Sequence, residues 1–480
     1  MIALRGNVRT WDGITRYGAT ASDPFASAEG AFDAQVRMTA RGKLLRILGV
    51  GFGLAAVVGS MVGQGILRTP GIVAGAVHAP GTILGLWFLG AVFAAISSLA
   101  FMELGTSVPC AGGPYDYVRR AFGPLAGVVV GWASWLVMIT GQAMLATVVG
   151  EFLQRLGVLV SVPTSFIAVA VLALFWAVNW TGTRISGSSQ MLFSALKGAA
   201  LIALIVFLLA HPAEGRSAPV EIDALGLLGI TVALRVITST YNGWQDIAYY
   251  CEELEQPERT LPRAMISGIA TVAVLYLLIN FALLHVLSPV EMAQSNLPAA
   301  DAATVVFGSM GEFALTLFGV LSVGAITNLK MMGSARLAYA LARGGSLPNA
   351  MTQVAESGTP RVALTVTTLI AAAFAATGTY TTIIATQIAL TVFSLAAANL
   401  AAIGLRRREP DLARPFRMPL YPIPVLLALA INLALLTAFV LEDPLHSLQG
   451  LVILAAIALI YSVLHRRRAQ REAQTTAAPS

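Results

Sequence analysis

The chain has 480 residues, of which 57% are hydrophobic and 11% are charged, and its mean hydropathy is +0.77. This composition excludes an ordinary soluble globular protein and indicates an integral membrane protein. The net charge is +6 and the pI is near 9.5. Because the basic residues lie beside apolar segments, this charge predicts membrane topology and no nucleic-acid partner.

Residues 1–43 precede the first apolar segment. They are polar, contain several arginines and lack an apolar core of the length that a secretory signal requires. We expect a disordered cytoplasmic tail and no cleavable signal.

Apolar stretches of roughly 17 to 25 residues can each cross a bilayer, and about twelve follow the tail. An even number of spans places both termini on one side of the membrane. Lys and Arg gather in the connections on that side, so the positive-inside rule predicts a multi-pass protein of the cell (inner) membrane with both termini in the cytoplasm. The expected spans are 44–76, 81–107, 123–154, 163–180, 187–210, 225–254, 264–288, 306–342, 361–377, 381–405, 420–441 and 447–464.

The first span is interrupted at its centre by the segment 59–65, GSMVGQG. Each glycine weakens a helix by about 1 kcal/mol relative to alanine, and non-helical backbone in lipid is tolerated only where it is buried in protein or lines a polar cavity. The half-helix beginning near Gly65 would offer N–H groups to a carboxylate, and the half ending near Gly59 would offer carbonyls to an ammonium. These two ends describe an amino acid; the alternative is a glycine-rich surface that only packs closely against other helices.

A second interrupted span lies at 225–254, where the sequence STYNGW at 239–244 breaks the apolar pattern. Breaks in the first and sixth spans are typical of an inverted five-helix repeat, with the broken helices facing each other at the midplane. This pattern predicts an alternating-access transporter. The expected parts are repeats at 44–210 and 225–405, helices 11 and 12 at 420–464, and a cytoplasmic C-terminal tail at 465–480.

Five ordered motifs carry a family resemblance. They are GSMVGQGILRTPG (59–71), FMELGTSVPCAGGPYDYVRRAFGP (101–124), YNGWQDIAYYCEELEQPERTLPRAM (241–265), GSARLAYALARGGSLP (333–348) and LRRREPDLARPFRMPLYP (405–422). From about Leu44 to Leu464 the chain resembles the amino acid–polyamine–organocation superfamily, and most of all its L-type transporter and bacterial amino acid permease branch. The resemblance implies an all-α leucine-transporter fold with discontinuous helices 1 and 6.

The resemblance also implies which residues bind substrate. The unwound part of helix 1 would hold the substrate carboxylate, and carbonyls of helices 1 and 6 would hold its ammonium. Gln64 departs from the family pattern, where a small residue is usual, so its amide would contact the substrate or narrow the site. The implied set is Val57, Val58, Ser60, Met61, Val62, Gly63, Gln64, Gly65, Thr240, Tyr241 and Gly243.

Lys197 lies within the fifth span, and ionisable groups inside a membrane are functional candidates by default. By resemblance, its ammonium would lie between helices 1 and 8, where sodium binds in sodium-coupled relatives. Carbonyls at the end of a half-helix need a positive partner, and an amine supplies one. The alternative is a lysine that snorkels to the cytoplasmic interface.

Arg235 and Lys330 are two further cations within spans, and the family pattern gives neither a role. Arg235 lies about two turns before the second break, where it would line the outer vestibule and attract an anionic group. Lys330 lies in the eighth span, and either cation would pair with a carboxylate such as Glu312 or simply anchor packing. For both residues a structural role is favoured over substrate contact.

Several residues of the matched motifs are gate candidates. Glu103 and Glu252 lie near the cytoplasmic ends of spans, where they would form ion pairs that close the inner gate; solvated loop charge is the alternative. Trp244 would be a gate or pocket aromatic, although aromatic residues in membrane helices more often pack or anchor the interface.

No metal-ligand spacing, nucleophile motif, P-loop or dinucleotide fingerprint occurs in the sequence, so we expect no metal, no cofactor and no enzyme. Neither break contains an acidic side chain, which favours small to medium neutral amino acids over cationic ones. Animal L-type transporters are linked to a glycoprotein through a cysteine between helices 3 and 4, and the segment 155–163 has none, so we expect no covalent partner.

The sequence therefore predicts a sodium-independent amino acid permease or exchanger. Two alternatives remain open. The first is a proton-coupled symporter of other amino acids or amines, including acidic ones. The second is a membrane nutrient sensor that does not transport.

Overall fold

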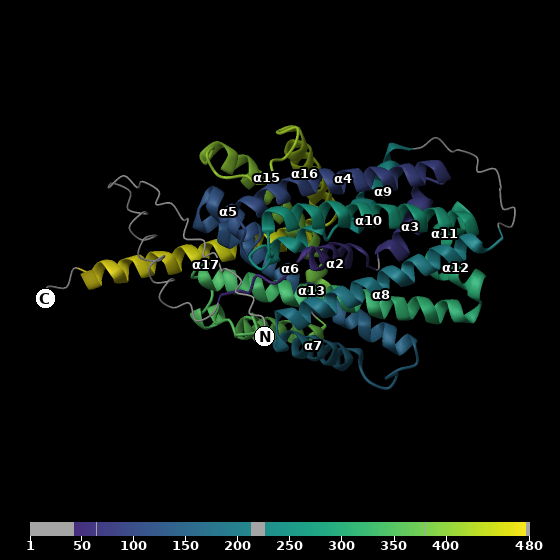
Figure 1. Ribbon diagram of the computed structural model, residues 1–480, viewed down its shortest axis with the longest axis horizontal. Helices are drawn as coiled ribbons and strands as arrows, with labels where there is room; N and C mark the ends of the chain where they lie inside the picture. The colour runs from purple at the N-terminus through teal and green to yellow at the C-terminus, as the bar shows by residue number, and fades with distance from the viewer. Residues whose placement is uncertain (1–42, 64, 213–225, 379, 477–480) are drawn as a thin grey trace, which may run out of the picture. The chain divides into compact units, whose positions relative to one another are not determined.

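The computed structural model describes residues 43–63, 65–212, 226–378 and 380–476 (Figure 1). Within these ranges the regular elements are helices, apart from one isolated β-bridge between Leu48 and Leu254. The predicted tail at 1–43 lies almost entirely outside the described residues. The predicted tail at 465–480 begins as a continuation of the last helix, which runs to Thr476.

Nine helices of the described chain are long and apolar enough to cross a membrane. They are α4 (Pro80–Ser107), α6 (Pro124–Arg155), α7 (Thr164–Thr181), α8 (Thr183–Ala210), α10 (Pro257–Val286), α13 (Ser309–Arg343), α15 (Tyr380–Arg408), α16 (Ile423–Glu442) and α17 (Pro444–Thr476). The shorter helix α14 (Arg361–Thr377) and the two broken spans described below account for the rest of the predicted set.

Short helices connect several spans. They are α5 (Pro114–Phe122), α11 (Pro289–Gln294), α12 (Pro298–Phe307) and the 3₁₀ turn η2 (Asn349–Thr352). Proline stands in the first turn of many helices, where its missing N–H costs nothing because that group has no partner within the helix. Examples are Pro80, Pro114, Pro124, Pro257 and Pro298.

Both predicted breaks are present. The first span divides into α2 (Val50–Met61) and α3 (Gly65–Ala76), whose axes differ by 44°. The sixth divides into α9 (Leu227–Thr240) and the 3₁₀ helix η1 (Trp244–Tyr250). Gly243 joins them at φ +121°, and a Cβ at this position would lie 2.9 Å from the backbone of Ser60. The two breaks therefore touch, and only glycine permits both this conformation and this approach.

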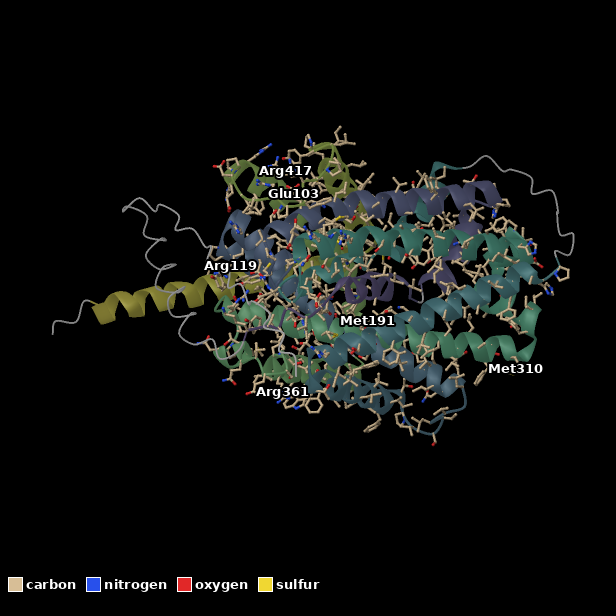
Figure 2. The ribbon with its side chains drawn as sticks, in the orientation of Figure 1. Glu103, Arg119, Met191, Met310, Arg361 and Arg417 are labelled. Atoms are coloured by element: carbon tan, nitrogen blue, oxygen red, sulfur yellow. The ribbon has the colours of Figure 1, made fainter. Side chains whose placement is uncertain are left out.

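Three pairs of helices from the two halves of the chain pack along each other: α4 with α10, α6 with α13, and α7 with α14. Charged residues near one end of these helices include Glu103, Arg119, Arg361 and Arg417, whereas Met310 lies at the other end (Figure 2). Arg119, Arg361 and Arg417, three of the basic residues used for the topology prediction, therefore lie toward the same end of the described helices (Figure 2).

Candidate functional site

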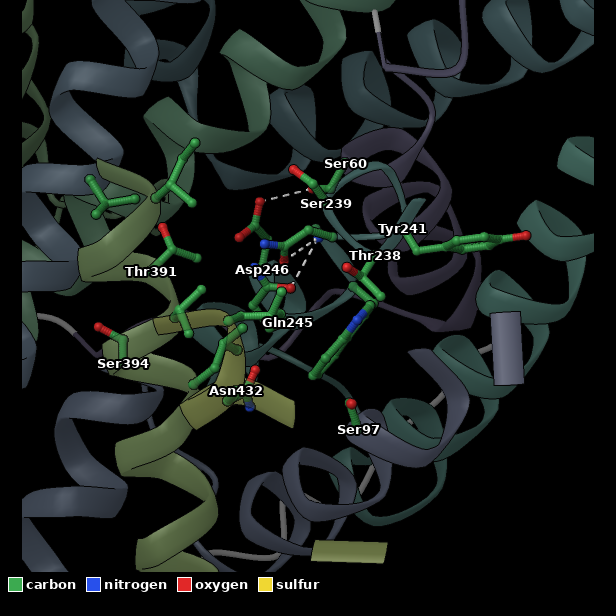
Figure 3. A pocket seen from close by; sticks show the side chains of 18 of the residues that line it. Ser60, Ser97, Thr238, Ser239, Tyr241, Gln245, Asp246, Thr391, Ser394 and Asn432 are labelled. Atoms are coloured by element: carbon green, nitrogen blue, oxygen red, sulfur yellow. Dashed lines mark hydrogen bonds between the residues drawn. The ribbon is translucent and has the colours of Figure 1, made fainter. Parts of the chain in front are cut away.

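A cavity of about 290 Å³ lies where the second break faces α4, α6, α13, α15 and α16 (Figure 3). Its wall combines aromatic and aliphatic groups with many hydroxyl and amide groups. Small-molecule sites in proteins have this character, because the apolar part gives affinity and the polar groups fix orientation. The polar lining includes Ser97, Thr238, Gln245, Thr391, Ser394 and Asn432.

A charged pair lies in the cavity wall. Asp246, in the first turn of η1, accepts a hydrogen bond from Ser60 Oγ on Oδ2 at 3.0 Å. The same oxygen lies 3.5 Å from Lys330 Nζ on α13. Both breaks and α13 thus meet at one carboxylate, which Figure 3 shows with its bond to Ser60.

Sequence reasoning missed Asp246 and named Glu312 only as an example of a carboxylate that Lys330 could meet. The partner is Asp246 rather than Glu312, which lies in the first turn of α13. The statement that neither break contains an acidic residue holds for 59–65 and 239–244, but a carboxylate two residues beyond Trp244 lines the cavity. The signal was present, because Asp246 is an ionisable residue within an apolar span.

Lys197 is buried and lies at the carbonyl end of α2. Its Nζ donates to the carbonyl oxygens of Gly59 at 2.5 Å and Val62 at 2.7 Å. Ser322 Oγ of α13 donates to the same Val62 oxygen at 3.0 Å, so the ammonium lies next to helix 8 of the predicted numbering. The side chain therefore points to the break and does not snorkel to an interface. The negative end of the α2 dipole supplies the attraction.

Only part of the predicted substrate-binding set faces the cavity. Ser60, Tyr241 and Gly243 line it, whereas Gln64 lies outside the described residues. The others do not line the cavity: Val57, Val58, Met61, Val62, Gly63, Gly65 and Thr240.

Internal hydrogen bonds explain this arrangement. Tyr276 Oη of α10 donates to the carbonyls of Met61 at 2.6 Å and Thr240 at 3.3 Å. The Thr240 hydroxyl lies 2.8 Å from that of Thr69. The Val58 carbonyl accepts from Val62 N at 3.0 Å. The Tyr276 hydroxyl thus satisfies the carbonyls of Met61 and Thr240, which the breaks release from helical bonding, as an apolar environment demands.

Two of the four gate candidates also line the cavity. Arg235 and Trp244 belong to its wall, and Trp244 packs edge-on against Phe101 at 5.1 Å between ring centroids. Glu103 lies elsewhere: it pairs with Arg406 of α15 at 2.5 Å and accepts from the backbone N–H of Met418 at 2.7 Å.

Glu252 makes two hydrogen bonds of 3.0 Å with Arg343. Glu103 and Glu252 are therefore ion-paired, and the alternative of solvated loop charge does not describe them.

A further ion pair, which is fully buried, lies just beyond the end of η1. Glu253 pairs with Arg336 of α13, and the Arg336 Nη2 also donates to Thr183 Oγ1 at 3.2 Å. The Glu253 carbonyl accepts from the backbone N–H groups of Ile47 at 3.1 Å and Leu48 at 3.0 Å. This inner clamp joins the chain before α2, the start of α8, the end of η1 and α13.

The part of the chain that the structure describes holds no group of three or more His, Cys, Asp and Glu side chains arranged for a metal. Cys110 and Cys251 are buried there as free thiols.

A family model described as amino acid permease matches residues 52–464. The serine/threonine exchanger SteT of Bacillus subtilis (strain 168) is 27% identical over 432 residues, which cover 88% of this chain and 98% of the relative. The b(0,+)-type amino acid transporter 1 of Homo sapiens is 28% identical over 421 residues, with 84% of each chain covered. The large neutral amino acids transporter small subunit 2 of Rattus norvegicus is 30% identical over 386 residues, with 77% and 72% covered. The chain therefore belongs to the amino acid permease family of the amino acid–polyamine–organocation superfamily, whose members are membrane transporters and not enzymes.

Proposed function

We propose that this multi-pass membrane protein is a sodium-independent secondary amino acid transporter of the cell (inner) membrane. The observation that carries the proposal is the contact between the two helix breaks at Ser60 and Gly243, beside a polar cavity of about 290 Å³. Membership of the amino acid permease family, and relatives that are amino acid transporters, support amino acids as the cargo.

Lys197 is the basis for sodium independence. Its ammonium donates to two carbonyls at the end of α2, so a fixed positive charge already balances the negative end of that half-helix. A sodium ion at the same carbonyls would have to displace it against like-charge repulsion.

Transport would proceed by alternating access. The broken spans with α4 and α10 would rock against α6, α7, α13 and α14, so that the cavity opens to one side at a time. The inner clamp supports this scheme, because it lies at the end of η1 where a cytoplasmic opening has to form. Both termini would lie in the cytoplasm, and no covalent glycoprotein partner would be required.

Small to medium neutral amino acids are the proposed cargo. The cavity holds one carboxylate and one ammonium that pair with each other, so they offer no net charge to a charged side chain. Arg235 in the cavity wall favours the second candidate, a proton-coupled symporter that accepts acidic amino acids. In that case Arg235→Ala would change the substrate ranking, and under the first proposal the ranking stays the same.

The test is uptake of a mixed radiolabelled amino acid set into liposomes that contain the purified protein. Sodium, the pH gradient and internal amino acid are varied separately. We expect uptake to persist without sodium and to rise with internal amino acid if exchange is the mechanism. Absence of any uptake, with ligand binding retained, would support the nutrient-sensor alternative.

Lys197→Ala tests the coupling element. We expect the variant to lose uptake, because the Gly59 carbonyl loses its ammonium partner, at a cost of about 1–3 kcal/mol when unpaired, and the Val62 carbonyl keeps only its bond from Ser322. Lys43→Ala is the matched control, since Lys43 is exposed ahead of α2. Strict sodium dependence of the wild type, or normal uptake by Lys197→Ala, would contradict the proposal.

A further inference from the structure

We propose that the pair formed by Asp246 and Lys330 selects an amino acid whose side chain ends in a carboxamide. This inference rests on the proposed function and names the substrate class of the same cavity. Its basis is the hydrogen-bonding capacity that the pair leaves unused.

The pair is loose and incompletely bonded. The distance of 3.5 Å between Lys330 Nζ and Asp246 Oδ2 is at the limit of a hydrogen bond. Across the residues that the structure describes, this is the one polar contact of the Lys330 ammonium, which has three N–H donors. Asp246 uses Oδ2 for both Ser60 and Lys330, and its Oδ1 has no hydrogen bond within the same ranges.

The pair also lies where a substrate side chain would reach it. Ser60 belongs to the first break and bonds Asp246 directly, so the pair borders the place where the breaks meet. The side chains of Asp246 and Lys330 are 9% and 20% exposed, and that exposure is to the cavity whose wall they form. A zwitterion held at the breaks would therefore direct its side chain toward them. Thr391 and Ser394 of α15 face the same space (Figure 3).

The chemistry of the side chain then decides the fit. An apolar group would exclude water from two charges without replacing their hydrogen bonds, which is costly in a buried site. A cationic group would meet Lys330, and an anionic group would meet Asp246. A carboxamide presents a carbonyl acceptor and an NH₂ donor side by side, so it can accept from Lys330 and donate to Asp246 at once. A hydroxyl carries its donor and its acceptor on a single oxygen, so it satisfies fewer of the unused hydrogen-bonding positions of Asp246 and Lys330.

The first test needs no variant. Unlabelled amino acids compete with uptake of radiolabelled L-glutamine into liposomes containing the wild-type protein. We expect glutamine and asparagine to inhibit at concentrations about fivefold lower than leucine, glutamate or lysine, with serine and threonine between, since one net hydrogen bond is worth about that factor. If another amino acid is taken up and leucine or a charged amino acid competes better than glutamine and asparagine, the inference is wrong and the proposed function stands. If no amino acid is taken up, the proposed function itself fails.

Two substitutions test the pair in opposite directions. Asp246→Asn leaves the Lys330 charge without its partner, so competition by glutamate should improve at least tenfold relative to glutamine. Lys330→Gln leaves the carboxylate alone, so competition by lysine should improve by a similar factor. Glu258→Gln is the control for loss of a carboxylate, because Glu258 is exposed in the first turn of α10. An unchanged ranking in both folded variants, judged by size exclusion in detergent, overturns the inference.

Discussion

Lys330 and Arg336 are cations of helix α13 that both face the chain after the second break, and the protein holds them very differently. Lys330 reaches Asp246 at 3.5 Å, and its side chain is 20% exposed to the cavity. Arg336 pairs with Glu253, and its side chain is 2% exposed. Arg336 also donates to the carbonyl of Met332 at 3.0 Å, in addition to its bond to Thr183.

The difference is the one expected between the binding element that we propose and a structural element. The guanidinium of Arg336 forms a fork with both oxygens of Glu253, so the inner clamp has little capacity left for another partner. The pair of Asp246 and Lys330 retains unused donors and acceptors beside a cavity. The same two elements, η1 and α13, are thus joined firmly at one end and offer open polar groups at the other. Any separation of η1 from α13 at the inner end has to break a buried ion pair.

The largest expected effect comes from breaking the inner clamp. Glu253→Gln leaves the Arg336 charge buried without its carboxylate, which costs about 3–5 kcal/mol. We expect a large fall in the melting temperature of the detergent-solubilised protein. Glu252→Gln is the matched control: its partner Arg343 is 32% exposed, and such pairs contribute about 0–1 kcal/mol. Equal falls in both variants would show that the two ion pairs do not differ as proposed.

The positions of the breaks were predictable because their cause is local. Glycines within an apolar span weaken the helix at that point, and α2 does end at Met61 with α3 beginning at Gly65. The family resemblance implied the location of Lys197, and a physical argument agrees with it: a cation in a membrane has few possible partners, and the carbonyl end of a broken helix is one of them.

The composition of the cavity was not predictable from local pattern. Ser60 and Asp246 are 186 residues apart in sequence, and Asp246 and Lys330 are 84 apart. Which carboxylate meets which cation depends on how the spans pack, and no periodicity encodes it. The hydrogen bonds from Tyr276 to the carbonyls of Met61 and Thr240 also join residues far apart in the sequence, and the local pattern did not predict them.

Gly243→Ala tests the contact between the two helix breaks. Gly243 directly precedes the segment that carries Asp246 and Glu253, the carboxylates of the two ion pairs. A side chain at φ +121° is strained, and its Cβ would lie 2.9 Å from the Ser60 backbone. We expect a loss of about 1–3 kcal/mol of stability together with reduced uptake. Gly198→Ala is the control, since a Cβ there meets nothing within 4 Å and alanine favours the α8 helix. Unimpaired stability and uptake in Gly243→Ala would mean that the breaks need not touch.

The smallest effects are expected at the hydroxyl partner of each ion pair, and they distinguish a pair that binds substrate from a pair that holds the structure. Ser60→Ala removes a donor to Asp246 at 3.0 Å, and Thr183→Ala removes the hydroxyl that links Glu253 and Arg336 at 3.2 Å. Each hydrogen bond contributes about 1 kcal/mol net. Suppose that the pair of Asp246 and Lys330 binds substrate and the inner clamp holds the structure. Ser60→Ala should then weaken the apparent substrate affinity about fivefold, which is equivalent to about 1 kcal/mol, with little change in melting temperature. Thr183→Ala should lower the melting temperature and leave the substrate ranking unchanged. Reversed results, with selectivity altered at Thr183 and stability lost at Ser60, would assign the two ion pairs the opposite roles.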